Sequence, residues 1–216
     1  MSGVLISLCD LTGRMVQPWV AAGYRAVLVD PQHVWSRTDG DVEKLALTVA
    51  EAMPEVRRHI SSGDVAAVFG FPPCTDLAVS GAGHFAAKAD ADPLYLAKAV
   101  AVAEQCRAIG QLSGAPWFVE NPVSRLASVW GEADHTFDPY EYTRWEPADN
   151  YTKKTCLWAG GGFRMPPPHR DVTLGPPDDR IHKAPPGPER ANFRSATPLG
   201  FARAVFDANA RTEAAA

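Results

Sequence analysis

The order of short apolar runs constrains the fold of this 216-residue chain more than any other feature. Four such runs occupy residues 3–9, 25–29, 65–69 and 117–119, and segments with helical features separate them. An apolar run of four to eight residues that ends in a glycine or proline turn is typical of a buried strand, and strands that alternate with helices form parallel sheets. We therefore predict an α/β fold with helices on both faces of one sheet.

The helical segments are expected at four places. Residues 14–22 connect the first two strands, and the spacing of apolar residues predicts an amphipathic helix over 41–59, interrupted at Pro54. A third helix should begin with Asp92 as its N-cap and Pro93 in its first turn, and should bury Cys106. The last helix is expected over 199–209. These segments would supply the layers that cover the sheet.

The turn at residues 70–75, Gly-Phe-Pro-Pro-Cys-Thr, follows the third strand and brings one cysteine to the edge of the sheet. Open α/β sheets bind their ligands at this edge, and two prolines hold the approach to Cys74 extended. A buried structural thiol is the alternative. The polar loop 79–85 that follows is a candidate lid, and His84 within it is expected to be a surface histidine rather than a partner of Cys74.

The ends of the first two strands carry carboxylates. Asp10-Leu11-Thr12-Gly13 follows the first strand, and Asp30-Pro31 closes the second strand 20 residues later. An acidic residue in this place can accept hydrogen bonds from ribose hydroxyls. Because no GxGxxG is present, the pattern disfavours a dinucleotide and favours an adenosyl cofactor without phosphates, such as S-adenosylmethionine.

Two later segments carry further polar residues that could act in binding or chemistry. Glu120-Asn121-Pro122 ends the strand at 117–119, and such side chains are costly to bury without partners; the alternative is that they cap a helix over 124–130. Residues 151–158 alternate like a strand, and Lys153 and Lys154 within it could contact a phosphate or a base carbonyl.

Composition narrows the class of protein. The four cysteines lie far apart without a CxxC pair, so neither a metal site nor a disulfide framework is predicted. The chain starts without the features of a signal peptide and has no run of about 18 apolar residues. We expect a cytoplasmic protein with reduced thiols and no membrane contact.

Charge and proline are concentrated in the last third. The formal charge is −4, but residues 1–150 hold 11 Lys and Arg against 19 Asp and Glu (−8), and residues 151–216 hold 10 against 6 (+4). Eight prolines over 166–188 predict a surface excursion, whose basic residues could contact nucleic acid or be solvated. Residues 131–150 are expected to be an irregular loop.

Together these motifs resemble the DNA (cytosine-5) methyltransferase family, particularly its short phage-type members. The turn 70–74 is similar to the nucleophile motif, in which Gln usually follows Pro-Cys where Thr75 stands here. Glu120-Asn121-Pro122 resembles the Glu-Asn-Val motif, and the two lysines stand where Gln-Arg-Arg-type residues are usual. The resemblance implies a Rossmann-like, S-adenosylmethionine-dependent methyltransferase sheet, and a bacterial host cytoplasm if the protein is phage-encoded.

The resemblance also implies a cofactor site. Residues 10–13 are similar to a shortened, glycine-poor form of the first cofactor motif, Asp30 matches the ribose-binding position, and residues 195–198 resemble the last motif, which returns beside the cofactor. The residues implied to bind S-adenosylmethionine are Asp10, Leu11, Thr12, Gly13, Asp30, Pro31, Pro72, Ser195 and Thr197.

The implied catalytic residues are Cys74, Glu120, Asn121, Lys153 and Lys154. Carbon 5 of cytosine is too weak a nucleophile until Cys74 adds to carbon 6, and Glu120 would offset the charge that develops on the ring. Asn121 would hold the loop and the base pocket. The thiol would need a nearby positive charge or a helix N-terminus to raise its thiolate fraction at neutral pH. A cytosine in duplex DNA would have to be flipped out of the stack.

Size distinguishes the chain from the family. The expected organisation is a catalytic core over 1–158, a proline-rich insertion over 159–194 that is a minimal target-recognition segment, and a C-terminal helix over 195–216 that returns to the core. The insertion has only 36 residues, so recognition would be relaxed or need a partner protein. Duplex or single-stranded DNA is the expected partner. RNA, a free deoxycytidine nucleotide, another transferred group, or a non-catalytic binding subunit are the alternatives.

Overall fold

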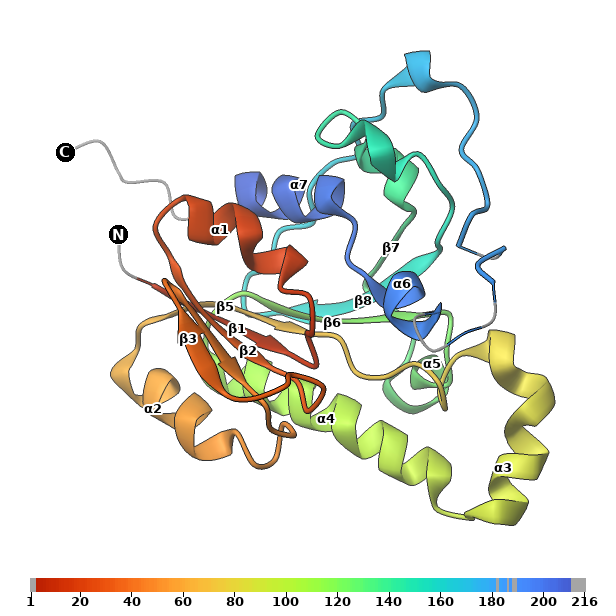
Figure 1. Cartoon of the computed structure of the whole chain (residues 1–216), viewed down its shortest axis with the longest axis horizontal. Helices are drawn as coiled ribbons and strands as arrows, with labels where there is room; N and C mark the ends of the chain where they lie inside the picture. Colours follow the sequence, from red (N-terminus) through yellow and green to blue (C-terminus); the bar gives the residue numbers. More distant parts are fainter. Residues whose placement is uncertain (1–2, 182, 186, 188–189, 211–216) are drawn as a thin grey trace.

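A computed structural model describes residues 3–181, 183–185, 187 and 190–210, and shows one eight-stranded mixed sheet between layers of helices (Figure 1). The strand order is β3-β4-β2-β1-β5-β6-β8-β7. This arrangement confirms the predicted α/β class and is consistent with a Rossmann-like fold. The strands are β1 (Val4–Leu8), β2 (Arg25–Val29), β3 (Arg37–Asp39), β4 (Val42–Leu45), β5 (Val65–Gly70), β6 (Trp117–Pro122), β7 (His135–Phe137) and β8 (Thr155–Gly160).

The central strands are parallel and the two edges of the sheet are not. β4, β2, β1, β5 and β6 run in one direction, β3 is antiparallel to β4, and β8 is antiparallel to both β6 and β7. All five residues of β1 and all six of β5 are buried. A strand covered on both faces carries apolar residues without alternation, which is why these runs could be read from the sequence.

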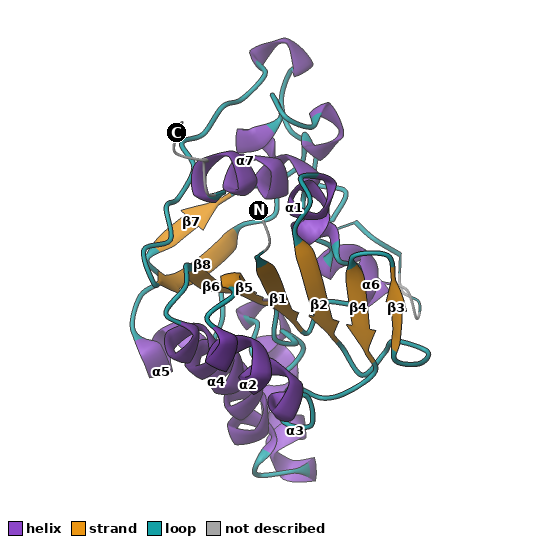
Figure 2. Cartoon of the chain, turned by 90° about the vertical axis from the view of Figure 1, so that its left-hand side faces the viewer, coloured by secondary structure: helices purple, strands orange, loops and turns teal. Residues whose placement is uncertain are grey.

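Helices cover both faces of the sheet, as predicted (Figure 2). On one face α1 (Gln17–Ala21) and α7 (Leu199–Asn209) pack Trp19, Phe201 and Val205 against Leu5 and Phe69. On the other face α2 (Met53–Ser62) and α4 (Tyr95–Ser113) pack residues that include Val56, Cys106 and Ile109 against Ile6, Val68 and their neighbours.

The helix predicted over 41–59 is wrong. Residues 42–45 form β4, and α2 begins only at Met53, with Pro54 in its first turn rather than interrupting it. Gly40 adopts φ +60° at the turn between β3 and β4, and Val42 pairs with Ala26 of β2. The spacing of the apolar residues fits a helix, but the hydrogen bonds offered by β2 favour a strand here.

The start of the third helix also differs from the prediction. α4 begins at Tyr95, and Asp92 lies before it, where its Oδ1 accepts a 3.0 Å hydrogen bond from the Leu94 backbone N–H. The loop predicted at 79–85 is a 3-10 helix, Val79–His84, continued by α3 (Phe85–Ala91). The predicted lid is therefore a helical arm in this structure.

The remaining predictions hold in outline. A 3-10 helix, Arg14–Val16, and α1 cover 14–22, α5 (Leu126–Trp130) lies within 124–130, and α7 matches 199–209. Residues 131–150 are less irregular than predicted, because they contain β7 and two 3-10 helices. β8 begins after Lys154 and extends past residue 158 to Gly160. The described residues of the excursion hold one 3-10 helix, Val172–Leu174, before α6 (Arg190–Ser195). Residues 211–216 of the predicted returning segment lie outside the described residues.

Within the described residues, no helix has both the length and the apolar character needed to cross a membrane.

Candidate active site

The strand order creates a switch point beside β1. β1 pairs with β2 on one side and with β5 on the other, so the chain leaves the carboxyl ends of these strands in opposite directions. Ligands of open α/β sheets bind in the crevice that results. The carboxyl ends of β1, β2, β5 and β6 carry Asp10, Asp30, Cys74 and Glu120, respectively. The four residues singled out from the sequence therefore lie along one edge of the sheet.

The Cys74 turn is fastened to the sheet on both sides. Phe71 N–H donates to the Leu8 carbonyl of β1 at 2.9 Å, and the buried Asn121 Nδ2 of β6 donates to the Pro72 carbonyl at 3.0 Å. After the turn, Ala78 N–H donates to the Cys74 carbonyl at 2.8 Å. The position of the thiol is thus set by β1 and β6 together, in agreement with the role expected of Asn121.

The helical arm after the turn is tied back to it by one lysine. Lys88 Nζ of α3 donates to the Thr75 carbonyl at 2.8 Å and to Asp76 Oδ1 at 2.6 Å. His84 is exposed, as expected of a surface histidine, and no hydrogen bond or ion pair joins it to Cys74 among the described residues. The structure therefore offers no Cys–His pair at this turn.

A carboxyl group and an ammonium group meet beside the thiol. Glu120 Oε1 lies 3.8 Å from Lys153 Nζ, and these side chains are only 13% and 11% exposed. This separation is too long for a hydrogen bond, and Glu120 Oε1 is buried without any hydrogen-bond partner in the described structure. Burial raises the pKa of Glu120 above its usual range, and the charge of Lys153 offsets only part of the effect. The site thus favours a neutral glutamic acid.

The pKa of the Cys74 thiol is also raised. Burial is the largest cause and the negative charge of Glu120 is the next, while the positive charges of Lys153 and Arg194 lower the pKa in part. The positive charges expected near the thiol are present, but desolvation outweighs them here. A proton on Glu120 would remove the second cause, so the two groups are electrostatically linked.

A small pocket opens onto Glu120 and Lys153. The enclosed cavity measures about 10 Å³, which is room for about one water molecule. Two of its aromatic walls, Phe137 and Phe201, are stacked with their ring centroids 3.9 Å apart. The pocket combines an apolar wall with one acid and one base. Its lining residues are Phe71, Glu120, Phe137, Lys153, Thr197, Pro198 and Phe201.

Asp10 is committed to the turn that follows β1. Its side chain is buried and accepts hydrogen bonds from Ser7 Oγ (2.7 Å), Thr12 N–H (3.0 Å) and Gly13 N–H (2.7 Å). Gly13 has φ +65°, and a Cβ there would meet Leu28 Cδ1 at 2.7 Å, so the turn requires glycine. Asp10 therefore shapes the backbone beside the crevice. Leu11 and Thr12 belong to the same implied cofactor motif. Leu11 is half-buried and Thr12 is exposed.

Asp30 is better placed to bind a ligand. It is buried at the tip of β2, burial raises its pKa, and its Oδ1 accepts from Gln32 N–H at 2.8 Å. Oδ2 accepts no hydrogen bond from the described residues. The buried His33 beside it has Nε2 without a partner. A carboxylate with an available oxygen fits the ribose of an adenosyl cofactor. Pro31, the other residue implied at this position, is exposed.

The last motif is divided between the pocket and the surface. Thr197 is buried and lines the pocket, whereas Ser195 is exposed and donates to the Asn192 carbonyl at 3.2 Å. Lys153 Nζ donates to the Ala196 carbonyl at 3.4 Å, which joins this segment to Glu120. Lys154 is exposed just before β8. The structure thus brings Cys74, Glu120, Asn121, Lys153 and Thr197 together and leaves Ser195 and Lys154 at the surface.

Sequence reasoning missed the aromatic wall of the pocket and the cation on α6. Phe71 stood inside the recognised turn without a role, and Phe137 lay in the supposed irregular loop. Phe201 lies in the helix predicted over 199–209 and packs in the core as well as lining the pocket. Arg194 directly precedes the last motif, and this position was the one signal that could have indicated it.

Comparison of the sequence with protein-family models and with curated proteins finds no match. An α/β fold of this kind hosts many unrelated activities, so function has to be argued from the residues of the site.

Proposed function

We propose that this chain is a methyltransferase that uses S-adenosylmethionine to methylate carbon 5 of cytosine in DNA, through a covalent adduct between Cys74 and carbon 6. The observation that carries the proposal is the buried Glu120–Lys153 pair at the end of β6, beside a thiol that β1 and β6 hold in place. Asp30, at the end of β2 along the same edge, supports a cofactor with a ribose.

The thiol supplies the covalent step. The thiol proton passes to solvent water, the sulfur of Cys74 bonds to carbon 6, and the electron pair of the carbon 5–carbon 6 double bond moves into the ring. Burial raises the pKa of Cys74 and so disfavours the free thiolate, and protonation of the ring during the attack offsets that cost. After methylation a base removes the proton on carbon 5, the carbon 6–sulfur bond breaks, and the thiolate is restored.

Glu120 supplies the proton that the ring needs. Burial raises its pKa, which favours the protonated carboxyl group, and in that form Glu120 can donate to ring nitrogen 3 as charge develops there. Lys153 lies 3.8 Å away and can contact the neighbouring carbonyl oxygen of the base. Asn121 keeps its own role as the group that positions the turn through Pro72.

The cofactor side uses Asp30, Gly13 and Thr197. When bound, S-adenosylmethionine supplies an electrophilic methyl group. Asp30 Oδ2 is available for a ribose hydroxyl, and the glycine turn at Gly13 allows close backbone approach. Thr197 lines the pocket from the segment that returns before α7.

The proposal is tested by supplying S-adenosylmethionine labelled in its methyl group with four acceptors in parallel: duplex DNA, single-stranded DNA, RNA and deoxycytidine monophosphate. We expect label in 5-methyldeoxycytidine from DNA. Cys74→Ser should lose at least roughly 10³-fold in rate, because a hydroxyl is a far weaker nucleophile near neutral pH. Ser128→Ala, an exposed change on α5, serves as the control.

Three results would contradict the proposal. Label found only in RNA or in the mononucleotide would reassign the substrate, and unchanged turnover in Cys74→Ser would remove the covalent mechanism. Binding of S-adenosylmethionine without transfer to any acceptor would identify a non-catalytic subunit. DNA that carries 5-fluorocytosine adds a direct check: the fluorine blocks the final elimination, so a protein–DNA adduct should persist and should be absent in Cys74→Ser.

A further inference from the structure

α6 lies between the proline-rich excursion and the wall of the pocket. The helix spans Arg190–Ser195 and has no buried residue, and the chain then passes directly into Thr197 and Pro198, which line the pocket. The hydrogen bond from Lys153 Nζ to the Ala196 carbonyl fastens the end of α6 to the Glu120–Lys153 pair. α6 is therefore an exposed helix that directly precedes two lining residues of the pocket.

Two neighbouring residues of α6 have the properties of a strand-binding surface. Phe193 is 51% exposed, which is high for a large aromatic side chain. The next residue, Arg194, is half-buried, and its positive charge reaches the Cys74 thiol. Proteins that bind single-stranded nucleic acid combine aromatic side chains, on which bases stack, with cations that follow the phosphates.

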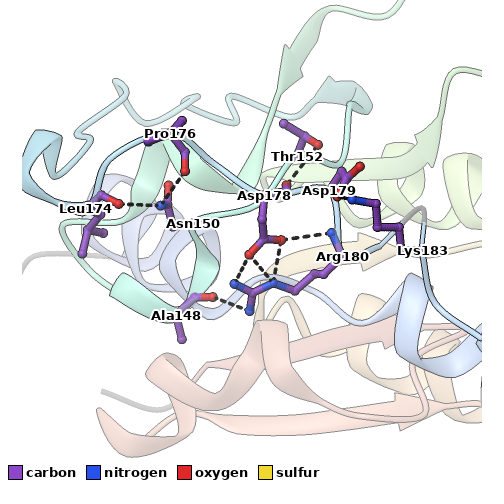
Figure 3. Close-up of polar contacts among 9 residues, drawn as sticks. All are labelled: Ala148, Asn150, Thr152, Leu174, Pro176, Asp178, Asp179, Arg180 and Lys183. Carbon is purple, nitrogen blue, oxygen red and sulfur yellow. Dashed lines mark hydrogen bonds and ion pairs between the residues drawn. The ribbon is translucent and has the colours of Figure 1, made fainter.

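The excursion is fastened to the core by backbone hydrogen bonds. Asp178 N–H donates to the Asn150 carbonyl at 3.1 Å, and Thr152 N–H donates to the Asp178 carbonyl at 2.8 Å. Arg180 pairs with Asp178 (Figure 3), and its guanidinium lies over the ring of Tyr151.

This arrangement suits a single strand better than a duplex. A specific duplex interface buries about 1,000–2,500 Å² of protein surface, which usually requires a broad or two-sided surface. A duplex cytosine must also be unstacked and unpaired before it can reach Cys74, whereas a base in a single strand is already accessible. A narrow helix with one aromatic residue and one cation can hold a strand on one side of the target.

We propose that α6 binds the substrate DNA as a single strand, with Phe193 stacked on the base next to the target cytosine and Arg194 bound to the phosphate that joins the two nucleotides. The inference rests on the proposed function, since it takes the pocket beside Cys74 as the place of the target base. It adds the form of DNA that is bound and the two residues that bind it.

The test measures binding without catalysis. A fluorescent oligothymidylate of 12 nucleotides with one central cytosine is titrated by anisotropy into Cys74→Ser protein without cofactor, beside the matching duplex and the matching RNA. Phe193→Leu should weaken binding of the single strand roughly 5- to 150-fold, which corresponds to the ~1–3 kcal/mol of one stacked base. Phe193→Trp should retain the affinity.

The arginine is tested through salt. Arg194→Gln should lower the slope of log affinity against log salt by about 0.7, the value for one phosphate of a single strand. Arg57→Gln, an exposed cation on α2, should leave affinity and slope unchanged. Thermal unfolding of each variant verifies that the protein is folded before its binding is interpreted.

Three results would overturn the inference. The first is that the protein shows no measurable binding of the single strand, and the second is that it binds the duplex or the RNA more tightly. The third result is that Phe193→Leu and Arg194→Gln bind the single strand with the same affinity as Arg57→Gln. These outcomes are distinct from failure of the proposed function. Methylation of DNA with unaffected α6 variants would reject the inference alone. If the α6 variants bind the single strand more weakly but the wild-type chain does not methylate DNA, the proposed function alone would be rejected.

Discussion

At the scale of single residues, the site depends on a carboxyl group whose pKa is raised by burial. Glu120 has an oxygen without a hydrogen-bond partner and a lysine 3.8 Å away, and desolvation raises its pKa. The folded protein therefore binds this proton more tightly than the unfolded chain does. Stability and the proposed chemistry are thus linked through one proton.

We predict a pH dependence with a definite sign. From the unfolded value of about 4.5 up to the raised pKa of Glu120, the folded state retains a proton that the unfolded chain loses, so the free energy of unfolding should fall as pH rises. Each pKa unit of elevation corresponds to about 1.4 kcal/mol. Glu120→Gln should reduce this fall, as measured by urea unfolding at a series of pH values. The part that remains comes from Asp30 and Asp149, whose pKa values burial also raises.

Glu51 provides a control of opposite sign. Hydrogen bonds from Thr48 lower the pKa of Glu51, so its contribution to stability is lost as pH falls. Glu51→Gln should reduce the acid sensitivity of the protein and leave the fall above pH 4.5 in place. A Glu120→Gln profile parallel to that of the wild type would show that Glu120 is ionised when buried, contrary to its proposed role.

At the scale of elements, the Cys74 turn is placed by the packing of β5 against α4. Gly70 ends β5 beside Cys106 of α4, and a Cβ at Gly70 would lie 2.8 Å from Cys106 Cβ. Phe71 and Pro72 then bond to β1 and β6. A displacement of α4 would be transmitted directly to the thiol.

Gly70→Ala tests this packing. We expect a loss of about 1–3 kcal/mol in the free energy of unfolding, because the added methyl group must displace α4 or β5. Methyl transfer should slow more than the binding of S-adenosylmethionine weakens, since the change acts on the position of Cys74. Gly83→Ala is the matched control, because a Cβ there meets nothing within 4 Å. Equal stability of the two variants would contradict this account.

At the scale of the whole molecule, the excursion is a local structure attached to a stable sheet. Arg180 is one of its attachments: it pairs with Asp178 and donates to the Ala148 carbonyl (Figure 3), and it lies over the Tyr151 ring. Asn150 Nδ2 adds a bond to the Leu174 carbonyl at 3.2 Å. The contacts are largely exposed, so they can open without unfolding the core.

Arg180→Met should therefore separate local from global stability. We expect faster thermolysin cleavage between residues 171 and 181, while the free energy of unfolding changes by no more than about 1 kcal/mol, as for other exposed ion pairs. Arg57→Met on α2 should affect neither measurement. If Arg180→Met unfolded the protein cooperatively at a much lower temperature, the excursion would be part of the core rather than attached to it.

The sequence by itself determined the parts of the fold that local physics controls. The fully buried runs of β1 and β5, and β2 after its exposed Arg25, are covered on both faces, and Gly114 ends α4 in the left-handed conformation. The turns after these strands follow from glycine and proline. Because the carboxyl ends of parallel strands share one edge, the neighbourhood of Asp30, Cys74 and Glu120 could be predicted as well.

Features that depend on residues distant in the sequence were decided only by the tertiary structure. Residues 42–45 became a strand because β2 offers hydrogen bonds that no local pattern records. Lys153 meets Glu120 because β8 lies antiparallel to β6, and burial then overrides the nearby charges in raising the pKa values of Glu120 and Cys74. Desolvation depends on the whole surrounding structure, so the protonation of the site could not be read from the motifs that identified it.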